Sequence, residues 1–330
     1  MPQTHDFSKQ RRLVLTGLAA ATGTLLIGPV AADTQRPVRL LVGFPAGGGT
    51  DAIARILAEP LREALGAPVV VENRAGAGGQ IAAQALKAAA PDGTTLFLSH
   101  DHTISIIPQV MRTPGFEPAT DFVPVAGFAT FVNALALSAG TPAQDFAAYV
   151  NWVRQQGGKS VVGIPAPASV PQFLVEVLAR RNQLELVAAP YRGSAPMMAD
   201  MLGNQIPAGV GSIPDFIENH KAGTVRVVAV MGKERQAVMP EVPTLAELGI
   251  PGFEDMPYYG IFAPAGTPSA VLERLSKALA QTLEQPRVRE RLTAMGLDVG
   301  FMSGEELNRR ERAYTQTWAR IIRESGFQPQ

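Results

Sequence analysis

Short apolar runs alternate with longer segments of helical periodicity in the first part of the chain. Apolar side chains at three- and four-residue spacing predict helices over 51–65 and 81–90, and Pro60 should kink or split the first of them. The intervening runs read as buried strands and lie at 38–42, 69–71 and 94–98. This βαβαβ alternation predicts a parallel sheet with helices on both faces.

The middle of the chain repeats the same scheme. Predicted strands lie at 134–137, 160–163, 186–188 and 226–230, and predicted helices at 141–156, 171–181, 195–202 and 269–283. Thr141-Pro142 has the form of a helix start, and Ser303 with Glu306 forms a capping box for a terminal helix over 305–325. The chain of 330 residues is therefore long enough for two α/β lobes.

The first 32 residues have the pattern of an export signal. Lys9, Arg11 and Arg12 precede an apolar stretch over 13–27, and small residues end at Ala32, where we expect cleavage. The stretch is short for a membrane span, which needs about 20 apolar residues. The paired arginines leave both the general and the twin-arginine export routes open.

Composition excludes several classes of function. The 29 basic and 29 acidic residues give a formal net charge of zero, so no positive field favours nucleic acid. The chain has no cysteine, which excludes disulfides, thiolate metal sites and thiol nucleophiles. It also has no serine in a G-x-S-x-G elbow, and no pair of carboxylates is marked out for acid–base catalysis. We therefore expect no enzymatic activity and no cofactor.

A glycine-rich segment, FPAGGGTD (44–51), joins the first strand to the first helix. Its three glycines leave the helix start free of side chains, and unpaired amides there would form an anion site. A tight turn capped by Thr50 or Asp51 is the plainer interpretation. The segment also satisfies the loose dinucleotide pattern over Gly47, Gly49 and Ala52, with Glu72 about 20 residues on. An exported dinucleotide-dependent oxidoreductase is thus an alternative, although no proton donor for hydride chemistry is evident downstream.

Two further stretches follow predicted strands. The loop at 73–80 is either a structural turn or a ligand wall. His100-Asp101-His102 lies where open parallel sheets receive ligands, and we expect hydrogen bonding to a ligand there or solvated loop residues. A metal site is disfavoured because no third ligand is evident. Tyr258-Tyr259 reads as core in preference to a ligand-facing pair.

The chain resembles the Bordetella uptake gene (Bug) family, the periplasmic solute receptors of tripartite tricarboxylate transporters. The resemblance spans about residues 36–326. The pieces that carry it, by their order and spacing, are FPAGGGTD (44–51), VVVENRAGAGGQIAAQAL (69–86), APDGTTL (90–96), PYRGSAPMMADMLGNQI (190–206), HKAGTVRVVAV (220–230), MPEVPTLAELGIPGFE (239–254) and YYGIFAPAGTP (258–268).

The resemblance implies a type II periplasmic binding protein: two Rossmann-like lobes joined by a hinge, with the ligand in the cleft. It places lobe one at 33–128 and 251–330 and lobe two at 129–250. It implies a small organic carboxylate as ligand, membrane subunits of the transporter as partners, a periplasmic location and a monomer. A sensory receptor with the same fold is an alternative. The ligand-binding residues that it implies are Phe44, Pro45, Ala46, Gly47, Gly48, Ser99, His100, Asp101, Ala166, Ser169, Tyr191, Gly193 and Ser212.

The chain departs from the family pattern in three places. The second carboxylate loop, usually rich in glycine and serine, reads GIPAPAS (163–169), and its prolines remove amide donors. An aspartate–asparagine pair is replaced by Gly211-Ser212, and a small polar segment by His100-Asp101-His102. We therefore expect a ligand other than the usual C4 dicarboxylates, with one carboxylate held by lobe one and a group that meets an imidazole or Asp101.

Overall fold

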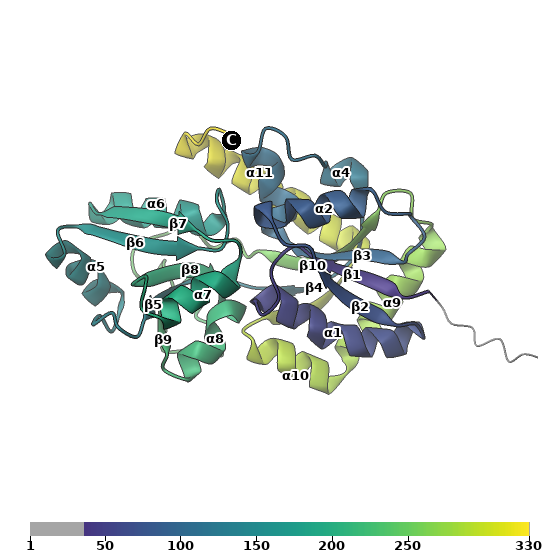
Figure 1. The fold of residues 1–330 in the computed structure, drawn as a ribbon, viewed down its shortest axis with the longest axis horizontal. Coiled ribbons are helices and arrows are strands. Elements are labelled where there is room, and N and C mark those ends of the chain that lie inside the picture. Colours follow the sequence, from purple (N-terminus) through teal and green to yellow (C-terminus); the bar gives the residue numbers. More distant parts are fainter. Residues whose placement is uncertain (1–35, 330) are drawn as a thin grey trace, which may run out of the picture. The chain divides into compact units, whose positions relative to one another are not determined.

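The computed structural model describes residues 36–329, and the predicted export signal lies outside them. The chain forms two α/β lobes, each built on a mixed sheet. Lobe one has the strand order β11-β4-β10-β3-β1-β2, and lobe two has the order β7-β6-β8-β5-β9. In Figure 1 the strands of lobe two are teal and green, whereas β1–β3 of lobe one are purple and blue.

Lobe one combines the beginning and the end of the chain. Its strands are β1 (Val38–Val42), β2 (Val69–Asn73), β3 (Thr95–His100), β4 (Phe122–Thr130), β10 (Tyr258–Pro264) and β11 (Asp298–Ser303). Its helices are α1 (Gly49–Leu65), α2 (Gln80–Lys87), α3 (Ile107–Val110), α4 (Pro118–Asp121), α9 (Ser269–Glu284), α10 (Pro286–Ala294) and α11 (Gly304–Ser325).

The sheet of lobe one is parallel only in part. β1 pairs in parallel with β2 and β3, as predicted, but β10 runs antiparallel to β3 and β4, and β11 runs antiparallel to β4. The predicted parallel pairing is therefore confirmed for the βαβαβ segment, and the strands that were not predicted make the full sheet mixed. β10 and β11 belong to the segment that returns to lobe one late in the chain, and both pair with β4.

Lobe two is formed by one continuous stretch of chain. Its strands are β5 (Asn133–Ser138), β6 (Lys159–Ile164), β7 (Glu185–Pro190), β8 (Ala208–Ser212) and β9 (Val225–Val230). Its helices are α5 (Phe146–Gln155), α6 (Val170–Asn182), α7 (Ser194–Leu202) and α8 (Ile213–Lys221). The β8–α8 pair was not predicted, because Gly209 and Gly211 hide the strand pattern.

Two predicted helix features differ in the structure. α1 runs without interruption through Pro60, which is buried where α1 packs against α9 and α10. α5 begins at Phe146, later than predicted from Thr141-Pro142, because the Asp145 carboxylate accepts a hydrogen bond from the Ala148 amide at 2.7 Å and caps the helix there. The capping box of Ser303 and Glu306 at the start of α11 is confirmed.

Two segments connect the lobes, and they differ in length. β4 ends at Thr130 and β5 begins at Asn133, whereas 27 residues (231–257) separate β9 from β10. The two segments touch, because the Phe131 amide donates to the Pro257 carbonyl at 3.1 Å. The fold class predicted from the sequence, two α/β lobes, is confirmed by the structural neighbours described below.

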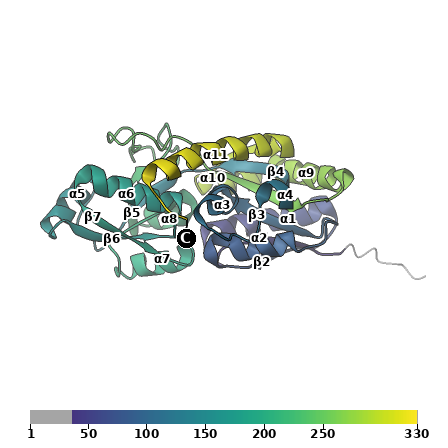
Figure 2. The same ribbon diagram turned by 90° about the horizontal axis from the view of Figure 1, so that it is seen from above.

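The terminal helix α11 contacts both lobes. It packs on β4 and β11 of lobe one, and its C-terminal end places Trp318 against Phe173 of α6, with ring centroids 5.9 Å apart. Figure 2 shows this helix, in yellow, extending from β4 toward α6. Among the described residues no helix is both long and apolar enough to cross a bilayer.

Candidate functional site

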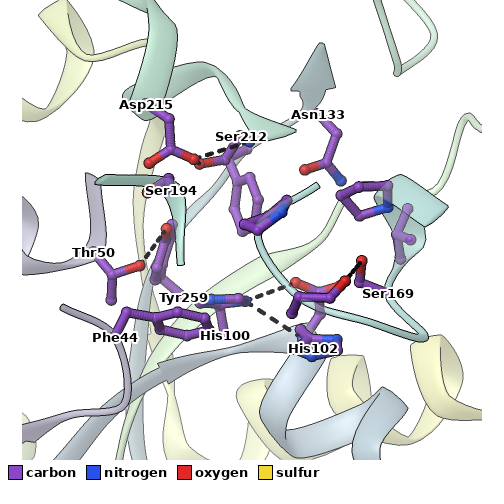
Figure 3. Close-up of a pocket in the computed structure, with 16 residues that line it drawn as sticks. Phe44, Thr50, His100, His102, Asn133, Ser169, Ser194, Ser212, Asp215 and Tyr259 are labelled. Carbon is purple, nitrogen blue, oxygen red and sulfur yellow. Dashed lines mark hydrogen bonds and ion pairs between the residues drawn. The ribbon is translucent and has the colours of Figure 1, made fainter. Parts of the chain in front are cut away.

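A cavity of about 50 Å³ lies where loops of the two lobes meet (Figure 3). On the scale of buried waters, this is room for roughly three to five water molecules. Lobe one and the passage from β4 to β5 contribute Phe44, Thr50, His100, Asp101, His102, Phe131 and Tyr259. Lobe two contributes Asn133, Pro165, Ala166, Ser169, Val170, Pro171, Ser194, Ser212 and Asp215.

His100 ends β3 and stands among aromatic rings. Its ring stacks on Phe44 with centroids 5.0 Å apart, and it meets Phe131 and Tyr259 edge-on at 5.9 and 5.3 Å. These contacts fix the plane of the imidazole, so its polar edge can point in one direction only.

Asp101 holds one nitrogen of that ring. The Nδ1 atom of His100 lies 3.2 Å from Oδ1 of Asp101, and the hydroxyl of Tyr314 donates to Oδ2 at 2.9 Å. Asp101 is buried, and burial, followed by the charge of Asp101, raises the pKa of Tyr314. The tyrosine therefore remains a donor, and the carboxylate is fixed between two partners.

His102 opens a π-helical segment, His102–Ile106, which continues into α3. Such segments are rare and occur often at functional sites. The residue is buried, and its Nδ1 has no hydrogen-bond partner in the described part of the chain. Burial, with a smaller contribution from the charge of His100, lowers the pKa of His102 to about 4, so the ring is neutral at neutral pH.

The glycine segment at the start of α1 is paired within the protein. The Gly47 amide donates to Oδ2 of Asp51 at 3.0 Å, and the Gly49 amide donates to Oδ1 of Asp215 in lobe two at 3.0 Å. The sequence predicts unpaired amides here, but two of them are bound by the chain's own carboxylates. The amides at the helix start thus hold carboxylates of the protein itself, and one of these, Asp215, comes from the other lobe.

Hydrogen bonds keep Asp51 ionised. Burial alone would raise its pKa, but hydrogen bonds from Arg55, Gly47 and Asn73 outweigh that effect and lower the pKa. The Asn73 amide joins Asp51 to the Phe44 carbonyl, at 2.9 and 3.1 Å. The loop that carries Phe44 is thus held by side chains from α1 and β2.

The second predicted loop, at 163–169, also uses its polar groups internally. The Ser169 hydroxyl donates to the Ala166 carbonyl at 2.6 Å, and the Ala168 amide donates to Gln172 at 2.7 Å. Pro165 and Pro171 present apolar surface to the cavity. The loop therefore lines the cavity mainly as an apolar wall.

The structure brings six of the predicted residues into the lining, namely Phe44, His100, Asp101, Ala166, Ser169 and Ser212. The others, Pro45, Ala46, Gly47, Gly48, Ser99, Tyr191 and Gly193, lie outside it. Tyr191 donates to Asp200 at 2.6 Å, and the buried hydroxyl of Ser99 has no hydrogen-bond partner within residues 36–329. Gly193 faces Pro45 across the lobes so closely that a Cβ would lie 2.5 Å from the proline Cδ.

Sequence reasoning gave no binding role to Asn133 or Asp215. Nothing in the local sequence marks Asn133. Asp215 had a signal, because Ser212-x-x-Asp215 is a capping box and the structure confirms both of its bonds. Tyr259 is both core and cavity wall, since it is buried and also lines the cavity.

The two alternative sites lack support in the geometry. Glu72, the candidate ribose acid, is bound by Arg39 at 2.8 Å and Arg74 at 2.6 Å. Hydrogen bonds from Arg39 and then Arg74 lower the pKa of Glu72, so this carboxylate has charged partners already. In residues 36–329 no group of three or more histidine or acidic side chains could hold a metal ion.

The family model of the tripartite tricarboxylate transporter family receptor matches residues 53–327. The chain belongs to this receptor family. It is 32% identical to protein BugT of Bordetella pertussis over 319 residues, which is 96% of this chain and 98% of BugT. The resemblance to the Bug family is therefore confirmed.

Solved structures agree with this assignment. The periplasmic binding protein BugD is 31% identical, with a TM-score of 0.84 over 90% of this chain and 99% of BugD. MatC of Rhodopseudomonas palustris with bound malate is 29% identical, with a TM-score of 0.81 over 87% of this chain and 99% of MatC. An R. palustris protein with adipate is 30% identical, with a TM-score of 0.85 over 90% of this chain and 99% of that chain. The family and these neighbours are solute-binding receptors.

Proposed function

We propose that the protein is a periplasmic receptor that captures a small organic carboxylate between its lobes and delivers it to the membrane subunits of a tripartite tricarboxylate transporter. The observation that carries this proposal is the cavity at the lobe contact, lined by polar side chains of both lobes. A ligand bound there contacts both lobes at once, so it favours their approach. The malate and adipate complexes of related proteins support a carboxylate ligand.

The remaining parts of the proposal follow from the same assignment. The mature protein begins after an export signal cleaved near Ala32, and it acts as a monomer. Lobe one comprises 33–128 and 251–330, and lobe two comprises 129–250. The ligand site is the cavity described above, and the protein needs no cofactor for this function.

Mass spectrometry of the molecule released from protein purified from its native host tests this function. We expect a small organic carboxylate at close to one equivalent. Release of a sugar, a nucleotide or a metal ion in that amount would contradict the proposal. Uptake of the released acid by cells with and without the gene then tests the transport role, and equal uptake would contradict it.

A further inference from the structure

The charges that line the cavity are all negative. Asp101 and Asp215 are its acidic residues, and none of the sixteen lining residues is a lysine or an arginine. Both carboxylates already have hydrogen-bond partners, from His100 and Tyr314 and from Gly49 and Ser212. A ligand with two carboxylates would bring two more negative charges into a partly desolvated space with no cationic side chain.

The start of α1 does not supply the missing positive potential. Its amides at Gly47 and Gly49 donate to Asp51 and Asp215, so the partial charge of this helix end faces carboxylates of the protein itself. A second ligand carboxylate at the Gly49 amide would have to displace Asp215, which is held as well by the Ser212 hydroxyl at 2.6 Å.

Uncharged polar groups of both lobes remain without partners in the described part of the chain. They are the side-chain amide of Asn133, the hydroxyl of Ser194 and Nδ1 of His102. These residues are 5%, 8% and 6% exposed. Of the three, only Nδ1 of His102 is a fully shielded atom, whereas the side chains of Asn133 and Ser194 line the cavity. Because buried polar groups in native proteins are normally hydrogen-bonded, these unpaired groups mark the cavity as a site for a polar ligand. In Figure 3, Asn133 and Ser194 lie above His100 and His102.

His100 sets the kind of group that the ligand must present. Nδ1 lies 3.2 Å from the Asp101 carboxylate and 3.4 Å from the His102 amide nitrogen. A carboxylate only accepts, so the shorter contact requires the proton on Nδ1. A ring that carries only this proton has its lone pair on Nε2, which has no partner in the described part of the chain. A hydroxyl or amino group of a ligand can donate to it.

We propose that the cavity selects a small monocarboxylate that also bears a hydroxyl or amino group, and that it rejects dicarboxylates. The ligand carboxylate accepts hydrogen bonds from the Asn133 amide and the Ser194 hydroxyl of lobe two. The hydroxyl or amino group donates to Nε2 of His100 in lobe one. A volume of about 50 Å³ favours a ligand of few atoms. This inference rests on the proposed function and replaces the expectation that lobe one holds the carboxylate.

Titration calorimetry with five four-carbon acids tests this inference on the purified mature protein. Butyrate has one carboxylate and no donor group, 2-hydroxybutyrate and 2-aminobutyrate add one donor, succinate adds a second carboxylate, and malate adds both. We expect at least one of the two donor-bearing monocarboxylates to bind about tenfold or more tightly than both butyrate and malate. Butyrate leaves Nε2 of His100 unpaired, and a site with an unpaired polar group rejects analogues that lack its partner. Malate has the donor but adds a second negative charge, which no lysine or arginine of the lining meets. The comparison of hydroxyl and amino acids identifies the donor.

Each other outcome overturns a separate claim. Malate or succinate binding as tightly as the best monocarboxylate overturns the ligand class but leaves a carboxylate receptor. Butyrate binding equally well overturns the role of His100. Binding of none of the five acids overturns the ligand class, while a carboxylate released from native protein would still sustain the proposed function.

Two variants test which protein side chain binds each end of the ligand. His100→Phe keeps the stacked ring but lacks Nε2, and should reduce the preference for the donor-bearing acid over butyrate to about one. Ser194→Ala should weaken both acids by the same factor and leave their ratio unchanged. Tyr149→Phe removes a buried lobe-two hydroxyl that bonds Ser160, away from the cavity, and serves as control. An unchanged preference in a folded His100→Phe protein contradicts the assignment.

Discussion

The amide nitrogen of Gly49 lies 3.0 Å from Oδ1 of Asp215, although the two residues are 166 positions apart in the chain. The bond joins the first turn of α1 in lobe one to the first turn of α8 in lobe two. A carboxylate at a helix N-terminus is stabilised by the helix dipole and by free amides. The protein therefore uses on its own lobes the interaction that helix starts commonly offer to anionic ligands.

Asp215→Ala should loosen the contact between the lobes. The variant removes the acceptor for the Gly49 amide and the partner of Ser212, at a cost of about 1–3 kcal/mol. Small-angle scattering of the unliganded protein should show a larger radius of gyration than for the unaltered protein. Asp200→Ala is the matched control, because that carboxylate accepts from Tyr191 within lobe two. Equal radii for Asp215→Ala and the unaltered protein would show that the bond does not hold the lobes.

Gly49→Ala should prevent close approach of the lobes. A Cβ at this position would lie 2.8 Å from Oδ1 of Asp215 and 3.2 Å from the backbone carbon of Pro214, so the lobes must separate. Ligand affinity should fall by about tenfold or more, or about 1.4 kcal/mol. Gly300→Ala, where a Cβ meets nothing within 4 Å, should leave affinity unchanged. Calorimetry on the released ligand measures both variants, and equal affinities would contradict the model of closure.

Stability should fall as the pH is lowered from about 6.5 toward about 4, because the pKa of His102 is lowered from 6.5 to about 4 in the fold. In this range the unfolded chain binds a proton at His102 that the folded chain does not, so added protons favour unfolding. The full effect is on the order of 3 kcal/mol. Urea unfolding between pH 7 and 4.5 should show a shallower decline for His102→Gln. The same slope in that variant as in the unaltered protein would assign the decline to other groups.

Tyr314→Phe should destabilise the protein by about 1–3 kcal/mol, since it leaves Oδ2 of the buried Asp101 carboxylate without its donor. The ring remains, so its packing against Tyr258 and Trp318 is preserved. Urea unfolding measures the loss. Tyr149→Phe, which removes a longer bond of 3.4 Å to Ser160, should cost less. A Tyr314→Phe protein as stable as the unaltered one would mean that water satisfies Asp101.

Local pattern was sufficient for the first half of each sheet. In lobe one, the strand at 38–42 and the helix that follows it were predicted from apolar runs and helical spacing. In lobe two, the strand at 160–163 and its following helix were predicted in the same way. β4 and β10 were not predicted, because their pairing depends on segments more than 120 residues apart. β10 is buried at every position, so it shows no alternation of apolar and polar residues.

The candidate site was predictable only where its chemistry is local. His100 and Asp101 adjoin a recognisable strand end, and Phe44 adjoins the glycine segment. Asn133 and Asp215 line the site only because the fold brings loops of the two lobes together. The glycine segment is a further example. The sequence indicated that an anion would bind at the start of α1, but not that this anion would be the side chain of Asp215, 166 residues away.

Trp318 makes the position of α11 across both lobes observable. It is one of two tryptophans in the chain, and its buried ring lies against Phe173 of the opposite lobe, whereas Trp152 stacks on Tyr149 within lobe two. Separation of the lobes would expose the Trp318 indole to water and shift its emission to the red, while Trp152 would emit as before. The chain thus has a built-in optical gauge of its own opening, which needs no attached dye.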